Sequence, residues 1–93
     1  MPASDYQLNA DGLTLVKWTN TSTTTLDMQA DSKLQRVNTI GTEAFKGSNL
    51  TSIVFPNSLK EIGEEAFLGT KLTGGVKFNT ASNVVFGKDA FSR

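Results

Sequence analysis

A five-residue word that occurs three times constrains the fold of this chain more than any other feature. The word Gly-x-x-Ala-Phe begins at Gly41, returns at Gly63 after 22 residues, and returns at Gly87 after a further 24. Repeats at a period of about 20 to 50 residues are typical of proteins built from stacked structural units. A unit of this length cannot bury its apolar side chains alone, so neighbouring units must cover one another. The sequence therefore predicts a stack of similar units.

The segments on both sides of this word repeat as well. Residues 50–55 (LTSIVF) align with residues 72–78 (LTGGVKF), which carry one extra residue at their glycine pair. Gly47 and Gly69 each lie three residues before the leucine that opens the next unit, where we expect the chain to turn. The alignment divides most of the chain into a degenerate repeat at 26–49, a repeat at 50–71, and a repeat at 72–93 whose end is uncapped.

The first part of the chain, residues 1–25, lacks the repeat word, and we interpret it as an N-terminal cap. Within it, residues 13–18 (LTLVKW) favour a strand because they are rich in β-branched and aromatic side chains. Trp18 and Tyr6 are expected to seal the end of the apolar column rather than to anchor a partner. With this cap, residues 1–93 are predicted to form a single domain.

The middle unit carries a recognisable pattern. Leu50-x-x-Ile53-x-Phe55 matches the LxxLxL strand of leucine-rich repeats, and residues 56–67 (PNSLKEIGEEAF) narrow the match. The chain resembles the BspA-like bacterial subclass of leucine-rich repeats, whose units read roughly LxxIxxPxxLxxIGxxAFxxx, over residues 37–91. The resemblance implies a right-handed solenoid that is mainly β, with short helical or 3-10 turns.

The resemblance also implies a function. Proteins of this kind are mostly bacterial surface or secreted proteins, and their repeats are associated with adhesion and protein binding. We therefore expect a non-catalytic interaction or adhesion module at the cell surface or secreted, with an unknown protein ligand, such as a host or cell-surface protein. The start of this chain shows no signal peptide, because it lacks a basic segment followed by an apolar stretch.

The strand pattern predicts which side chains face inward. All six phenylalanines are expected to be buried in the column, where each contributes about 1.5–3 kcal/mol to stability. One ladder is predicted from Phe45, Phe67 and Phe91, and a second from Phe55 and Phe78, while Phe86 replaces the isoleucine that precedes the other two words.

Each position of the word also has an expected role. The glycine is predicted to adopt a positive φ, and the alanine to let a short helical turn pack closely. The acidic residues at the variable positions, such as Glu43 and Asp89, are expected in the first turn of that short helix, where they favour its dipole.

Outward positions of the strands are the candidate binding residues. Alternation along a strand turns Ser52 and Val54 away from the column, and the alignment places Asp27, Val54 and Lys77 side by side. In leucine-rich repeats such a row lines the concave face, where ligands often bind. We predict a binding row of Asp27, Ser52, Val54 and Lys77; the alternative is a merely solvated sheet face.

The residue inventory argues against most catalytic chemistry. The chain has no histidine and no cysteine, which removes the commonest general base and the best nucleophile. Glu61, Glu64 and Glu65 are the densest carboxylates, so an enzyme with carboxylate chemistry is the less favoured alternative, and no cofactor or metal is expected. Nine basic and nine acidic side chains cancel, which disfavours nucleic acid as a partner. No apolar run is long enough for membrane insertion.

Two further expectations follow from the uncapped end of the last repeat. An uncovered repeat exposes a strand edge and apolar side chains, so we expect self-association through it or a fragment of a longer repeat array. A structural spacer whose surface binds nothing is the alternative to the adhesion module.

Overall fold

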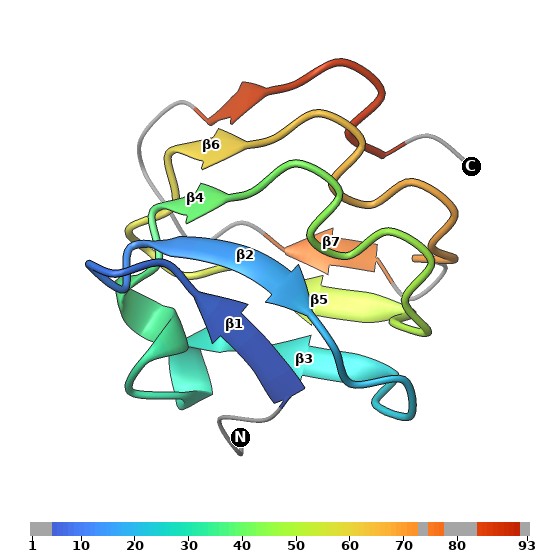
Figure 1. Ribbon diagram of the computed structural model, residues 1–93. Coiled ribbons are helices and arrows are strands. Elements are labelled where there is room, and N and C mark those ends of the chain that lie inside the picture. The colour runs from blue at the N-terminus through green and yellow to red at the C-terminus, as the bar shows by residue number, and fades with distance from the viewer. Residues whose placement is uncertain (1–4, 73–74, 78–83, 92–93) are drawn as a thin grey trace.

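The computed structural model describes residues 5–72, 75–77 and 84–91, which form two sheets and two short 3-10 helices (Figure 1). The five-stranded sheet has the order β1 (Tyr6–Leu8), β2 (Thr14–Trp18), β4 (Thr39–Ile40), β6 (Glu61–Ile62) and β8 (Val85–Phe86). The three-stranded sheet has the order β3 (Thr25–Asp27), β5 (Ser52–Val54) and β7 (Gly75–Lys77). The 3-10 helices are η2 (Met28–Ala30) and η3 (Leu34–Arg36). The described chain is thus mainly β with short 3-10 segments, as the sequence predicts.

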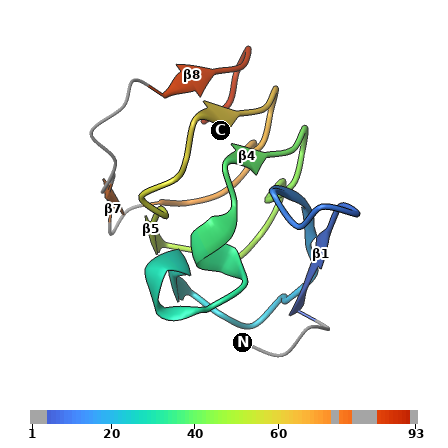
Figure 2. The same cartoon turned by 90° about the vertical axis from the view of Figure 1, so that its left-hand side faces the viewer.

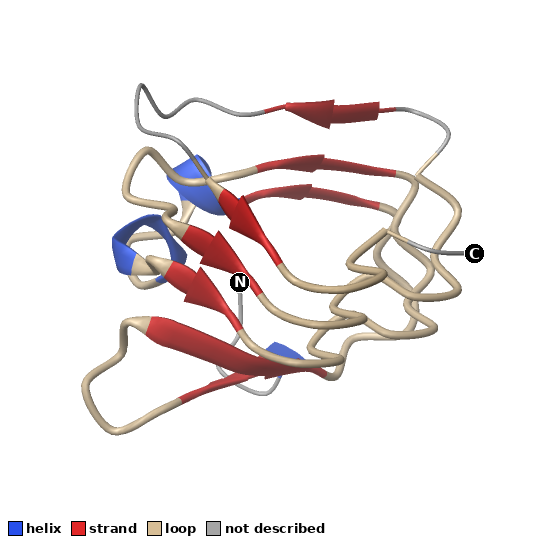
Figure 3. Cartoon of the chain, turned by 90° about the horizontal axis from the view of Figure 1, so that it is seen from above, coloured by secondary structure: helices blue, strands red, loops and turns tan. Residues whose placement is uncertain are grey.

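From β2 onward the chain passes alternately between the two sheets. Each passage adds one strand to one sheet, and every pairing is parallel except that of β1 with β2, which is antiparallel. Figure 3 shows the 3-10 helices at one end of the strands and the turns of the repeated words at the other. In Figure 2, β8 lies at one end of the stack and β1 at the other. The fold is therefore a series of layers, each contributing to both sheets.

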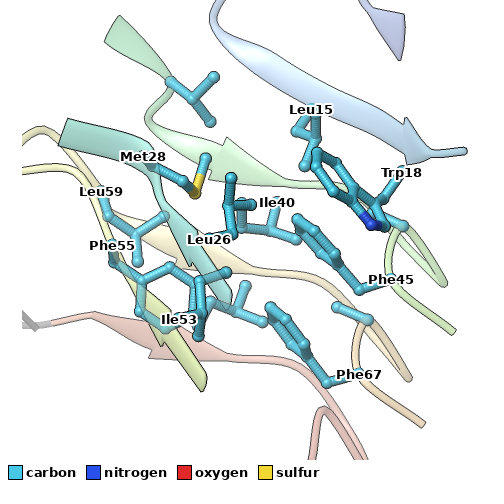
Figure 4. Packing of buried hydrophobic residues seen from close by; sticks show 14 of the residues in the cluster. Leu15, Trp18, Leu26, Met28, Ile40, Phe45, Ile53, Phe55, Leu59 and Phe67 are labelled. Atoms are coloured by element: carbon cyan, nitrogen blue, oxygen red, sulfur yellow. The ribbon is translucent and has the colours of Figure 1, made fainter. Parts of the chain in front are cut away.

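Inward side chains from both sheets meet in one apolar core. In the five-stranded sheet the register aligns Leu15, Ile40 and Ile62, and all three are fully buried. The other sheet contributes Leu26 and Ile53, which are also buried. Figure 4 shows four of these side chains between the two sheets: Leu15, Ile40, Leu26 and Ile53. Burial of aliphatic rows that no single layer could hide is what drives the layers together.

A ladder of aromatic rings runs through the layers. The rings of Phe45 and Phe67 stack at 4.7 Å between centroids, and those of Phe67 and Phe91 at 5.0 Å. Trp18 stacks on Phe45 at 5.6 Å, and Tyr6 lies 6.5 Å from Trp18 with nearly parallel rings (Figure 4 shows Trp18, Phe45 and Phe67). Both Tyr6 and Trp18 are buried. The predicted ladder is confirmed, and two residues of the N-terminal segment extend it.

The last described layer departs from the prediction that all phenylalanines are buried. Phe86 takes the place of Ile62 in the register, as expected, but it is 51% exposed, and Phe91 is 37% exposed. Both lie in the outermost layer that the structure describes, which explains why their rings are less covered than those of the inner layers. Phe55 is fully buried against the edge of Phe67, while Phe78 lies outside the described residues.

The glycine of the repeated word has a different role from the one predicted. The positive-φ glycines in the described chain are Gly12, Gly47 and Gly69, so the expectation for the word is wrong, whereas the expected turns at Gly47 and Gly69 are confirmed. A Cβ on Gly63 would lie 2.7 Å from the backbone nitrogen of Thr42 in the preceding layer. Glycine is required here because backbones of successive layers approach too closely for any side chain.

The positive φ within the word belongs to its third residue instead. Glu43, Glu65 and Asp89 have φ between 55° and 58°, a left-handed conformation that is unfavourable for non-glycine residues. The words form turns and contain no helix, so the predicted helix-dipole role of these acidic residues is wrong. The physical reason is that the turns bond to one another. The backbone N–H of Phe45 donates to the carbonyl of Ala66 at 2.7 Å, in place of a bond within a helix.

The close approach at Gly63 is testable by adding one methyl group. We expect Gly63→Ala to lower the free energy of unfolding by about 1–3 kcal/mol, because the backbone of the neighbouring layer must move to admit the Cβ. Urea unfolding followed by circular dichroism measures the effect. Thr42→Ala is the control, because Thr42 is exposed and is the second residue of the preceding word. This substitution should change stability by less than about 0.5 kcal/mol. Equal midpoints for wild type and Gly63→Ala would show that the two backbones are not in close contact.

Candidate functional site

The three-stranded sheet holds the row of outward residues that the sequence predicts. Its register places Asp27 opposite Val54, and Val54 opposite Lys77. Asp27 is exposed, Ser52 and Val54 are half-buried, and Ile53 between them points into the core. For Lys77 the structure describes the backbone position only. The backbone thus brings these residues together; whether the row binds a ligand stays a prediction.

Asp27 also has a structural role at the start of η2, which was not predicted from the sequence. It is the N-cap of η2, and its Oδ1 accepts a hydrogen bond from the backbone N–H of Gln29 at 3.0 Å. The Gln29 side chain in turn accepts from the backbone N–H of Asn57 at 2.9 Å, which ties η2 to the chain that follows β5. One end of the row is therefore held in place by hydrogen bonds between neighbouring layers.

Asp31 fixes the chain just beyond η2. Its Oδ1 accepts from the backbone N–H groups of Lys33 at 2.8 Å and Leu34 at 3.1 Å, and the residue is only 9% exposed. Burial alone would raise the pKa of this carboxyl, but the amide hydrogen bonds from Leu34 and Lys33 hold the pKa below its ordinary value. The pKa of Tyr6 is raised, chiefly by burial and then by the adjacent Asp31 charge.

The five-stranded sheet presents a second outward row that the sequence interpretation missed. Its register aligns Thr14, Thr39, Glu61 and Val85 across β2, β4, β6 and β8. Thr14 and Thr39 are half-buried, whereas Glu61 and Val85 are exposed. The signal was present in the sequence, because each of these residues directly precedes the inward residue of its strand. The molecule therefore offers two regular rows, one on each sheet.

A polar groove of about 430 Å³ lies where the strands of the three-stranded sheet begin. It collects residues from three separate segments: the connection before β3, the turn before β5 and the turn that follows the second word. Its lining is Ser22, Thr24, Gly47, Ser48, Asn49, Thr51, Gly69 and Lys71. The sequence predicted turns at Gly47 and Gly69 but not a groove between them.

The carboxylates of the repeated words lie on the surface, where Glu43 is close to Lys46 and to Glu65 of the next word. Glu43 and Lys46 form a surface ion pair at 2.8 Å. The hydrogen bond and charge of Lys46 lower the pKa of Glu43, and Glu43 raises the pKa of Lys46 in the same way. Within the described part of the chain, no three acidic residues lie close enough together to hold a metal ion. Whether Glu61, Glu64 or Glu65 takes part in carboxylate chemistry stays a prediction.

The described helices are too short to cross a membrane. Across residues 5–72, 75–77 and 84–91, no helix combines the length and the apolar character needed to span a bilayer.

The repeated word, the layered parallel strands and the leucine and isoleucine positions define a leucine-rich repeat protein. Comparison with family models identifies the subclass of leucine-rich repeat. Residues 18–93 match the model described as "BspA type Leucine rich repeat region (6 copies)". The chain belongs to the BspA-type leucine-rich repeat family. The match begins at Trp18, upstream of residues 37–91, over which the sequence pattern shows the resemblance. No curated protein and no solved structure matches the chain.

The Asp31 hydrogen bonds predict a specific pH dependence. A carboxyl whose pKa is lowered on folding stabilises the protein above its ordinary pKa of 3.8, and this stabilisation is lost as the pH falls through the lower pKa of the folded state. We expect Asp31→Ala to cost about 1 kcal/mol at neutral pH. The difference from wild type should shrink once the pH falls below 3.8.

Urea unfolding of both proteins over this pH range makes the measurement. Glu61→Ala, at an exposed strand position, is the control and should differ from wild type by less than about 0.5 kcal/mol at neutral pH. An Asp31→Ala difference that stays constant down to strongly acidic pH would show that the charge of Asp31 contributes nothing.

Proposed function

We propose that this chain is a non-catalytic protein-binding or adhesion module of a bacterial cell-surface or secreted protein, built as a right-handed solenoid. Membership of the BspA-type family is consistent with an interaction or adhesion role. The observation that carries the proposal is the outward row of the three-stranded sheet. There an acidic, an apolar and a basic residue occupy matching positions on β3, β5 and β7.

The rigidity of this row supports binding. Neighbouring strands lie about 4.8 Å apart, so a ligand meets the three positions at a fixed spacing. Ile53 lies directly behind the row in the buried core, and the cap formed by Asp27 fixes the end of β3. A surface that is ordered before binding loses little conformational entropy when the complex forms. The row is therefore suited to recognising an extended or flat protein surface.

The absence of catalytic activity is proposed on two grounds. The chain contains no histidine or cysteine, so general-base and thiol chemistry would have to come from other groups. None of the described residues that line the polar groove at the start of the three-stranded sheet carries a carboxylate. A carboxylate enzyme would need two such groups facing one substrate.

Charge changes on the row test the proposed binding face. Surface plasmon resonance against a panel of immobilised extracellular matrix and serum proteins identifies a ligand and its affinity. We expect Val54→Asp and Lys77→Glu each to weaken binding at least about tenfold, because a mismatched charge at the centre of an interface is costly. Circular dichroism should remain that of wild type, since Val54 is not part of the buried core and Lys77 occupies the matching register position on β7.

Matched substitutions on the other sheet are the control. Thr39→Asp and Lys60→Glu make the same kind of charge change at β4 and just before β6, and should leave binding unchanged. Equal loss from both pairs would locate the binding face elsewhere. If no member of the panel binds, or if all four variants are silent, the structural spacer becomes the better account.

Self-association is a second candidate function, supported by the exposure of the last described strand. Val85 and Phe86 of β8 are 64% and 51% exposed, and Phe91 is 37% exposed. β8 pairs with β6 and ends the sheet order of the described chain. An edge strand that carries large apolar side chains is a template for pairing with another strand. We propose that a second copy of this chain covers it, β8 against β8.

Light scattering over a range of concentrations tests this pairing. The molar mass of the wild type should rise towards that of a dimer, and Val85→Lys should weaken the association by about tenfold or more, because a charge would be buried between the two strands. Val16→Lys is the matched control, since Val16 is 44% exposed but lies on β2 inside the sheet. A monomer at every concentration would exclude this mode of association.

A further inference from the structure

The polar groove described above has a hydrogen-bonding pattern that restricts what it can bind. Three of its polar side chains already donate a hydrogen to the protein. The Thr51 hydroxyl donates to the carbonyl of Thr24 at 3.1 Å, and the Ser22 hydroxyl donates to Oδ1 of Asn20 at 3.2 Å. The side-chain amide of Asn49 donates to the carbonyl of Thr21. These bonds fix the orientation of the three groups.

The orientation of these donors leaves the corresponding oxygens as acceptors. A hydroxyl that has donated its hydrogen keeps its lone pairs, and an amide keeps its carbonyl oxygen. Thr51, Ser22 and Asn49 therefore offer acceptors around the groove, and a complementary ligand must bring hydrogens to them. A ligand without hydrogen-bond donors would leave these oxygens unpaired on losing their water, which costs free energy.

The hydroxyl of Ser48, which also lines the groove, has not donated its hydrogen. Its Oγ is buried, and within residues 5–72, 75–77 and 84–91 it has no hydrogen-bond partner. A buried hydroxyl without a partner is unfavourable because it has lost its hydrogen bonds to water. Rotation of Ser48 about χ1 towards the groove would therefore break no hydrogen bond, and it would supply a donor to a ligand that also accepts.

The charge of the groove limits the ligand further. Among the described residues of the lining, Lys71 is the one cation and none is acidic. A cationic ligand would be repelled by the ammonium group. A fully ionised anion would be attracted to Lys71, but the hydroxyls of Thr51 and Ser22 have already donated their hydrogens and present only lone pairs to it. Of these three groups, only the second amide hydrogen of Asn49 could donate to the anion. The pattern instead suits a neutral ligand rich in hydroxyl groups, each of which both donates and accepts.

We propose that this groove is a saccharide-binding site, in which sugar hydroxyls donate to Thr51, Ser22 and Asn49 and accept from Lys71 and Ser48. The volume of about 430 Å³ falls within the usual range for small-molecule sites. Because no described residue of the lining has an aromatic ring to stack on a sugar face, we expect a dissociation constant on the order of 1 mM for a monosaccharide.

The site is separate from the proposed protein-binding row, although it adjoins it. Thr24 and Thr51 of the groove directly precede β3 and β5, whose outward residues form the row. Sugar binding is independent of the proposed function, since a free sugar is the probe and row variants such as Val54→Asp should leave its affinity unchanged. Failure of one proposal is therefore distinguishable from failure of the other.

Nuclear magnetic resonance titration tests the site directly. Methyl glycosides of glucose, galactose, mannose and N-acetylglucosamine are added separately to the isotope-labelled chain, and inorganic sulfate is added as the anionic comparison. We expect saturable shifts of the backbone amides of Ser22, Ser48, Asn49 and Lys71 with at least one glycoside. The absence of saturable shifts with all four glycosides, or tighter binding of sulfate than of any glycoside, would overturn the proposal.

Substitutions identify the groups responsible. Thr51→Val keeps the shape of the side chain but removes the acceptor, and should weaken glycoside binding about three- to tenfold. Thr42→Val, at an exposed position outside the groove, is its control and should have no effect. Since Thr51→Val also removes a bond to Thr24, Lys71→Ala provides a second test with Lys60→Ala as its control. Unchanged glycoside affinity in both Thr51→Val and Lys71→Ala would overturn the assignment.

Discussion

The close approach of glycine backbones between layers is the constraint on which the rest of this structure depends. Gly63 lies against the backbone of Gly41 and Thr42, and Gly87 lies against that of Gly63 and Glu64, at distances that exclude even a Cβ. This contact sets the separation of the words, and the same separation allows the N–H of one turn to reach the carbonyl of the next. The stacked phenylalanine rings and the paired strands then follow at a common spacing.

Much of the fold could be predicted because the repeated units of the sequence can be aligned with one another. Matching one unit to the next predicted the stacking of Phe45 on Phe67 and the register that places Asp27 beside Val54. The role of the glycine could not be predicted in the same way. A glycine that adopts a positive φ and a glycine that admits a neighbouring backbone are identical in sequence, and only the distance between layers separates them. Glu65 shows the converse case: an acidic residue adopts the positive φ that was expected of the glycine.

The candidate sites also differ in how far the sequence alone could reveal them. The row on the three-stranded sheet follows from alternation within a strand, which is local and visible in the sequence. The polar groove is formed by three segments that are at least 18 positions apart, and the hydrogen bond from Thr51 to Thr24 that orients its lining spans 27 positions. No local pattern encodes such a bond. The second row, which includes Glu61, follows from the same alternation, but three of its four strands have only two residues, too few to show the alternation clearly.

The position of the single tryptophan has a consequence for how the folding of this molecule can be followed. Trp18 is buried between Tyr6 and Phe45, at one end of the aromatic ladder, and the last described ring is Phe91. Its fluorescence therefore reports on the N-terminal layers alone, whereas circular dichroism averages over all strands. In a linear array each layer is stabilised mainly by its immediate neighbours, so the layers can melt in sequence. Comparing the unfolding transitions seen by fluorescence and by circular dichroism would therefore measure how far cooperativity extends along the stack.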